Sequence, residues 1–154
     1  VLLPDLLGQG EFNATEDSAT VQRLVDDERS YSAFTFGYNQ TLVSQRVNDL
    51  IDVIGLAHQT QNASVRMLAN GGAAPWSVAT TAFLAPQQLT KVVLDTDGFR
   101  FADVESYHDA NFVPGSVKYG DLPMLLKLCS ATLRTDSTTD QAIDSPDNLT
   151  WLTQ

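Results

Sequence analysis

The sequence predicts an α/β fold: a three-layer sandwich built on a mostly parallel sheet of at least three strands. Short apolar runs alternate with helical patterns, and each strand–helix unit spans roughly thirty residues, which favours parallel strands joined by crossover helices. The chain has 154 residues, of which 43% are apolar, so it suffices for one domain with a buried core. We expect residues 1–131 to form that core, followed by a polar C-terminal tail, residues 132–154, of uncertain structure.

Three apolar runs have the length and composition of buried strands. The first is Val1–Leu6, which leads into a glycine-containing loop. The second is Ser64–Ala69, which ends at a sharp turn formed by Gly71 and Gly72. The third is Leu89–Asp95, which is followed by a long segment rich in aromatic and turn-forming residues.

The clearest helix begins at Thr41 and ends near His58, because apolar residues recur at helical spacing from Val43 to Ile54. Residues 73–84 predict a helix of mostly small side chains, which lets it lie close to the sheet and become largely buried. The other helical segments are 20–31 and 122–128, and residues 148–152 form a short last element.

Nineteen acidic residues against nine basic ones give the chain a formal net charge of −10. Binding to nucleic acid needs clustered Lys and Arg, so this charge argues against a nucleic-acid partner and against an anionic membrane surface. No run approaches the roughly 18 apolar residues of a membrane span. The sequence therefore indicates an acidic, soluble domain.

The chain begins at Val1 inside an apolar run and carries no signal-peptide pattern, so we expect it to be an excised piece of a longer protein. Its single cysteine, Cys129, excludes an intramolecular disulfide and leaves the redox compartment undetermined. The localisation stays open, with secretion and a periplasm among the alternatives.

Four stretches carry a resemblance to the acetyl-xylan-esterase-like branch of the α/β-hydrolases, and their order along the chain matches that family. They are residues 3–11 (LPDLLGQGE), residues 34–39 (FTFGYN) with 45–50 (QRVNDL), residues 67–76 (MLANGGAAPW) and residues 113–123 (VPGSVKYGDLP). The resemblance covers residues 1–131 and implies the central strands of that fold. The family's opening strands, and its closing strands with the catalytic acid and histidine, have no counterpart here.

The third stretch occupies the place of the nucleophile elbow, a Gly-x-Ser-x-Gly turn that projects a serine between strand and helix. The corresponding residues are 69–73 (ANGGA), and Gly71 falls where the resemblance implies the serine. Glycine has no nucleophilic atom, so a Ser-His-Asp triad is not complete in this chain. We interpret the turn as a tight packing turn; alternatively, the N–H groups of Gly71 and Gly72 bind an oxyanion or a carbonyl.

His108, in the aromatic segment, and Asp97, after the third strand, are the candidates for an orienting pair near that turn. Such a pair would have only water to activate. Ser77 is the nearest hydroxyl and is expected to point along its helix, and Ser116 is expected to be a turn residue.

No cofactor and no metal are predicted. The acidic residues Asp95, Asp97 and Asp103 show no metal-ligand spacing, and a Gly-x-Gly-x-x-Gly dinucleotide motif is absent.

The sequence favours a hydrolase-like domain, related to carbohydrate esterases, that has no independent esterase activity and has a structural or binding role. The first alternative is an ester hydrolase completed by another segment or chain. The second is a flavodoxin-like module that binds a small ligand through the Gly71 turn and Asp97. Missing flanking strands leave sheet edges open, so the expected partners are a second copy or the remainder of the parent chain. The expected ligand class is a carbohydrate ester.

Overall fold

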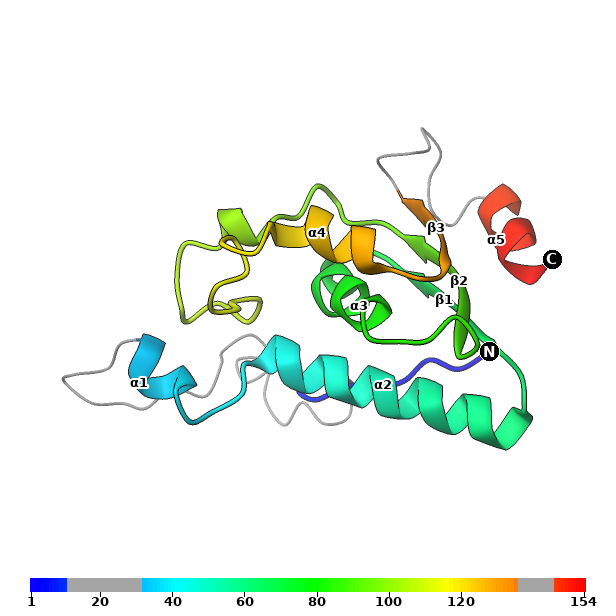
Figure 1. Cartoon of the computed structure of the whole chain (residues 1–154), viewed down its shortest axis with the longest axis horizontal. Helices are drawn as coiled ribbons and strands as arrows, with labels where there is room; N and C mark the ends of the chain where they lie inside the picture. Colours follow the sequence, from blue (N-terminus) through cyan, green and yellow to red (C-terminus); the bar gives the residue numbers. More distant parts are fainter. Residues whose placement is uncertain (11–31, 136–145) are drawn as a thin grey trace.

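A computed structural model describes residues 1–10, 32–135 and 146–154. These residues form an α/β fold around a parallel sheet, as the sequence predicts (Figure 1). The sheet has three strands in the order β1-β2-β3, which are β1 Val65–Ala69, β2 Leu89–Leu94 and β3 Thr132–Thr135. Both strand pairs are parallel, so at least three parallel strands are confirmed.

Helices and short 3-10 turns make up the other regular elements of the described ranges. They are α1 Ser32–Phe36, α2 Leu42–Gln61, η3 Gly71–Ala73, α3 Ala74–Thr81, η4 Phe101–Asp103, α4 Asp121–Leu128 and α5 Pro146–Thr153. The predicted start of α2 is confirmed, because the Thr41 hydroxyl oxygen accepts a hydrogen bond from the Ser44 N–H at 3.1 Å and caps the helix. None of the helices in these ranges is long and apolar enough to cross a membrane.

The core lies between the sheet and α3, which α2 and α4 flank. Val78 on α3 and Val92 on β2 are both 0% exposed and belong to one apolar cluster with Leu122 of α4. Seven of the eight residues of α3 are buried, which confirms the prediction that small side chains let this helix sink into the fold. A second cluster joins α2 to α3 around Trp76.

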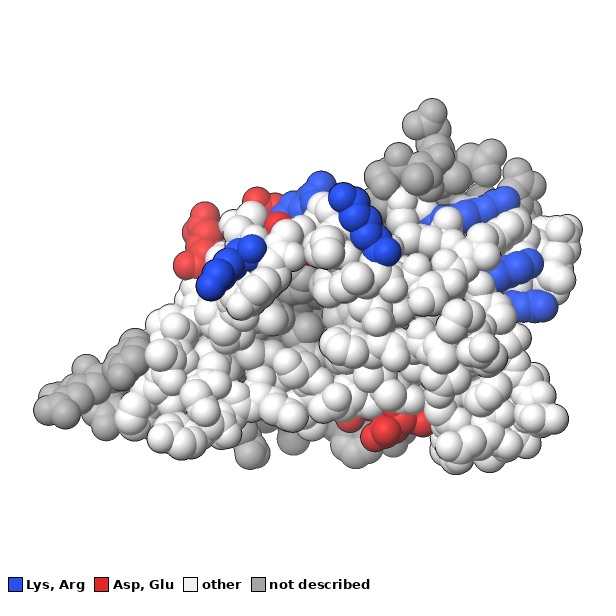
Figure 2. Space-filling model, viewed as in Figure 1, with Lys and Arg blue, Asp and Glu red and all other residues white. Residues whose placement is uncertain are grey.

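Helix α5 contacts the sheet through basic side chains that extend from the strands. Lys91 Nζ donates to the Trp151 carbonyl at 3.0 Å, and Arg66 Nη1 donates to the Thr153 carbonyl at 2.7 Å. The Arg134 guanidinium lies 4.3 Å from the centroid of the Trp151 ring. Carbonyls at the C-terminal end of a helix carry partial negative charge, so these cations hold α5 in place. Figure 2 shows basic side chains gathered at this end of the molecule.

The prediction of a buried strand at Val1–Leu6 is wrong. Residues 1–6 form no strand, and the side chains of Val1, Leu2 and Leu3 are exposed. The adjacent backbone is bound instead by side chains of α2. The Leu7 N–H donates to Asp49 Oδ2 at 3.0 Å, and Arg46 Nε donates to the Leu7 carbonyl at 3.0 Å. These bonds tie the segment to α2 rather than to the edge of β1.

The sheet extends into the tail that the sequence leaves unassigned, because β3 lies within it. The short last element expected at residues 148–152 is helix α5, which is longer than that range. Helix α2 runs three residues past His58 to Gln61, whereas α3 ends at Thr81 rather than at residue 84. The helix expected at residues 20–31 lies outside the described residues.

Candidate functional site

The turn after β1 has the strand-to-helix geometry that the sequence predicts. Asn70 is extended, with φ −132° and ψ 154°, and Gly71 turns into the left-handed region at φ +51°. The Ala73 N–H donates to the Asn70 carbonyl at 3.1 Å, which closes the turn, and α3 begins at the next residue. The chain therefore passes from strand to helix through four residues, 70–73.

This turn carries no side chain where an elbow would carry its nucleophile. A Cβ atom placed on Gly71 or on Gly72 would meet no heavy atom within 4 Å. Asn70 makes no side-chain capping hydrogen bond at the start of η3. The backbone is thus presented to open space, and neighbouring atoms would permit a side chain at either glycine.

The end of β2 lies directly beside the turn. The Asp95 N–H donates to the Ala69 carbonyl at 2.9 Å, so the carboxyl ends of β1 and β2 meet at one edge of the sheet. The Asp97 N–H in turn donates to Asp95 Oδ1 at 3.0 Å, which binds one oxygen of that carboxylate into a local turn. Asp97 is exposed and has a left-handed φ of +47°.

His108 makes only local contacts within the part of the chain that the structure describes. Its backbone N–H donates to Ser106 Oγ at 3.1 Å, and its ring centroid lies 4.2 Å from that of Tyr107. The side chain is exposed, and no hydrogen bond or ion pair joins it to Asp97. The structure therefore places the two candidates for an orienting pair without bringing them together.

A cavity of about 370 Å³ opens next to the turn and is enclosed by β1, α2 and the N-terminal residues 2–6. Asn70, Ala73, Trp76 and Ser77 line the end nearest the turn. Ser77 is 3% exposed and Trp76 is 5% exposed. Neither the Ser77 hydroxyl nor the Trp76 indole N–H hydrogen-bonds to another described residue. Buried donors of this kind usually bind water or a ligand, so this wall can donate to an oxygen in the cavity.

The sequence analysis missed one residue that shapes this region. Arg46 is 4% exposed, and its guanidinium lies 4.5 Å from the centroid of the Trp76 ring. Burial lowers the pKa of Arg46 from its ordinary value, and the charge of Asp49 opposes that shift. Arg46 falls on the apolar face of α2, beside Val43, Val47 and Leu50. A basic residue at such a position could have been recognised from the sequence as a candidate buried cation.

No metal centre is formed by the described residues. Within residues 1–10, 32–135 and 146–154, no group of three or more His, Cys, Asp or Glu side chains converges on one point. Comparisons with models of protein families, with curated proteins and with solved structures find no match. The role of the chain is therefore inferred from its own residues.

Proposed function

We propose that this chain is a hydrolase-like domain, related to carbohydrate esterases, that has no esterase activity of its own and has a structural or binding role. One observation carries the proposal: Gly71 makes the left-handed turn between β1 and α3 with φ +51° and has no side-chain oxygen to attack a carbonyl carbon. The ordered resemblance of the four sequence stretches supports the relationship to α/β-hydrolases, including their three-layer arrangement.

An ester hydrolase completed by another chain is the second candidate. The open space around Gly71 favours it, because a Cβ placed on Gly71 would meet no heavy atom within 4 Å, which leaves room for a hydroxyl from outside the chain. Ser77 and Trp76 line the neighbouring cavity, and their buried donors have no described hydrogen-bond partner, so they are available to the oxygen of an ester. This candidate differs from the first in needing a partner before any turnover occurs.

Hydrolysis of a 4-nitrophenyl acetate ester tests the proposal on the purified chain. We expect release of nitrophenol at the rate of the buffer alone, because the turn has no nucleophile to form an acyl-enzyme and His108 and Asp97 form no pair that would activate water. A fluorophosphonate probe should leave the intact mass of the protein unchanged. The absorbance spectrum of the same sample should contain no flavin band.

Two variants make this test decisive. Gly71→Ser introduces a hydroxyl at the turn, and we expect it to remain at the background rate because His108 makes only local contacts among the described residues. His108→Ala serves as the matched control. Turnover by the unmodified chain that His108→Ala abolishes, or a probe bound to the peptide containing Gly71, contradicts the proposal.

We further propose that the edge of β1 that pairs with no described strand binds β1 of a second copy of the chain. Strand β1 is hydrogen-bonded only to β2 in the described sheet. The Val65 N–H and the Ala69 carbonyl are directed to β2, and alternate residues of a strand direct their peptide groups to opposite edges. Arg66 and Leu68 therefore present their N–H and C=O groups to the open edge. Antiparallel pairing of two such edges satisfies both copies equally.

Light scattering coupled to size-exclusion chromatography tests this pairing. We expect a dimer for the unmodified chain and for Leu68→Ala, which keeps the edge N–H. Leu68→Pro removes that N–H without removing a bond to β2, so we expect a folded monomer. A monomeric unmodified chain, or a Leu68→Pro dimer, excludes association through this edge.

A further inference from the structure

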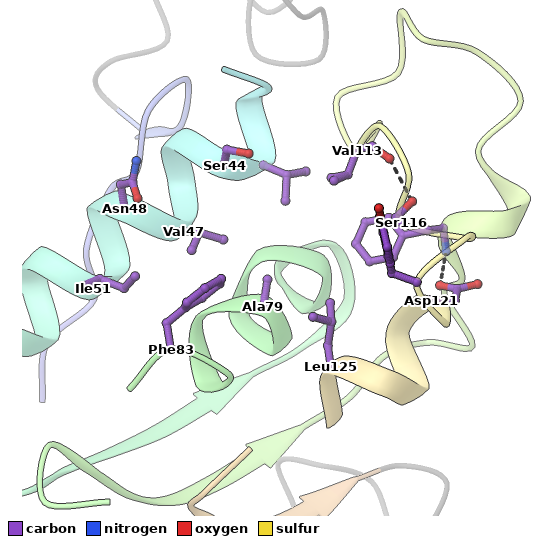
Figure 3. A pocket seen from close by; sticks show the side chains of 13 residues that line it. Ser44, Val47, Asn48, Ile51, Ala79, Phe83, Val113, Ser116, Asp121 and Leu125 are labelled. Atoms are coloured by element: carbon purple, nitrogen blue, oxygen red, sulfur yellow. Dashed lines mark hydrogen bonds between the residues drawn. The ribbon is translucent and has the colours of Figure 1, made fainter. Parts of the chain in front are cut away.

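A second cavity, of about 340 Å³, lies on the side of α3 that faces away from the sheet. Helix α2 forms one wall, α3 forms the floor, and the segment from Val113 to Leu125 forms the opposite wall. Figure 2 shows the surface hollowed between α2 and this segment. Figure 3 shows the side chains of Val47, Ala79, Phe83 and Leu125 arranged around one open space.

The lining is mostly apolar, and its deeper part is fixed by the core. Val47 is 7% exposed and Phe101 is 4% exposed, so both are anchored in the packed interior. Phe83 is 71% exposed and Tyr119 is 73% exposed, although both side chains line the cavity. Ligand sites in proteins are typically apolar clefts of roughly 300–1,000 Å³ with a few polar groups. This cavity has that size and character.

The polar groups of the lining retain capacity for hydrogen bonds. The Ser116 hydroxyl donates to the Val113 carbonyl at 2.9 Å, which leaves its oxygen free to accept. The Asn48 amide and the Tyr119 hydroxyl make no hydrogen bond to other described residues. The cavity therefore offers an acceptor on one wall and uncharged donors at its rim.

The one carboxylate in the lining already has its hydrogen-bond partners. Asp121 accepts N–H groups from Phe101 at 2.8 Å, Ala102 at 3.3 Å and Leu122 at 2.6 Å. Its charge repels a ligand anion. The rest of the lining is mostly apolar, and burying a charge there is costly, so the site favours an uncharged molecule.

The wall that carries these groups is shaped before any ligand binds. Gly115 has a φ of +81°, and a Cβ there would lie 3.3 Å from the Tyr119 ring, so the glycine lets the ring lie against the turn. Lys118 Nζ lies 5.5 Å from the centroid of the same ring. This wall includes residues 113–123, the fourth stretch of the resemblance described above. These residues are not part of the Gly71 turn.

We propose that this cavity binds a small, uncharged ligand with an aromatic or branched apolar body and one secondary amide group. The body fills the space between Val47, Ala79 and Leu125. The ligand N–H donates to Ser116 Oγ, and the ligand carbonyl accepts from the rim. The site is separate from the Gly71 turn and does not depend on the absence of esterase activity.

Acetanilide is the probe, and NMR titration of the full chain is the measurement. We expect a dissociation constant below about 1 mM, which a ligand of this size reaches in a well-formed apolar site. The largest shifts should fall on Val47, Ala79 and Leu125, with none at Val93 on the sheet. Benzoate should bind at least about tenfold more weakly, because it brings an anion beside Asp121.

Ala79→Phe fills the cavity from the floor and should abolish acetanilide binding. Gln59→Phe adds the same ring to an exposed position of α2 that lines none of these cavities, so it should bind like the unmodified chain. The shift map of the unmodified chain keeps the test decisive even where Ala79→Phe fails to fold.

Ser116→Ala tests the proposed hydrogen bond from the ligand amide separately from the apolar contacts of the ligand body. Acetanilide should lose about three- to tenfold in affinity, the loss expected from one hydrogen bond, whereas phenyl acetate, which has no N–H, should be unchanged. Absence of binding, shifts that fall outside the cavity, equal binding of benzoate, or an equal loss for both ligands overturns the proposal.

Discussion

The turns that lead into α3 and α4 both contain a glycine with a positive φ, but the two glycines differ in how closely other atoms pack against them. Gly71 before α3 has a φ of +51°, and Gly120 before α4 has a φ of +97°. A Cβ on Gly71 would meet nothing within 4 Å, whereas a Cβ on Gly120 would lie 2.9 Å from Met124 Cβ. Close packing therefore requires a glycine before α4 but not before α3.

The hydrogen bonds at the two turns differ in the same direction. The first residue of α4, Asp121, binds three backbone N–H groups, two of them from η4. The residues before η3 and α3, Asn70 and Ala73, make no side-chain capping bond. One turn is fixed by a carboxylate and by contact, and the other by its backbone alone. The interpretation of Gly71 as a glycine demanded by tight packing is therefore not supported by its surroundings.

Asp121→Ala should produce the largest loss of stability at these turns. Three N–H groups lose their acceptor, and alanine must adopt the left-handed φ of +57° that Asp121 has. At about 1 kcal/mol for each lost bond and for the backbone, we expect a loss of roughly 4 kcal/mol. Urea unfolding followed by circular dichroism measures it.

Asp121→Asn is the matched control for that variant. Asparagine tolerates the left-handed backbone and keeps one oxygen acceptor, so roughly half of the loss should remain. A loss below about 1 kcal/mol for Asp121→Ala would show that the carboxylate does not hold η4 to α4.

Gly120→Ala should have the next largest effect, a loss of about 2–3 kcal/mol, because it combines a positive φ with a contact to Met124. Gly98→Ala separates the two causes. Gly98 has a φ of +69° with no atom within 4 Å of an added Cβ, so only the backbone contribution of about 1 kcal/mol should appear. Similar values in urea unfolding for the two variants would contradict a steric role for Met124.

The fold could be predicted from the sequence wherever apolar spacing and a local signal agree. Helix α2 has both an apolar stripe and the Thr41 cap, and β2 ends in the apolar residues Val92, Val93 and Leu94, with Asp95 directly after it. Strand β3 is short and polar, and it is stabilised by pairing with β2, which no local pattern reveals. The prediction of a strand at Val1–Leu6 is wrong because composition alone does not make a strand. The run is apolar, but no described strand pairs with it.

The backbone turn of the candidate site could be predicted from the sequence, whereas the two cavities could not. The strand-to-helix turn at Gly71 follows from two adjacent glycines between a strand and a small-residue helix. The unpaired donors of Ser77 and Trp76 depend on what packs beside them, and the burial of Arg46 depends on the approach of Leu7 and Trp76. Residues 43–51 and 113–125 lie far apart in sequence, so the cavity between them carries no local signature.

The turn before α3 should show the smallest effects. Gly71→Ala changes only the backbone preference at φ +51°, so we expect a loss of about 1 kcal/mol in urea unfolding, well below that of Gly120→Ala. Gly72 has no positive φ and no atom within 4 Å of an added Cβ, so Gly72→Ala should stabilise the chain by about 0.5 kcal/mol through the unfolded state. A loss of several kcal/mol in either variant would mean that this turn is packed as tightly as the one before α4. The space beside Gly71 would then be too small for a hydroxyl supplied by a partner, and only the non-catalytic role would remain.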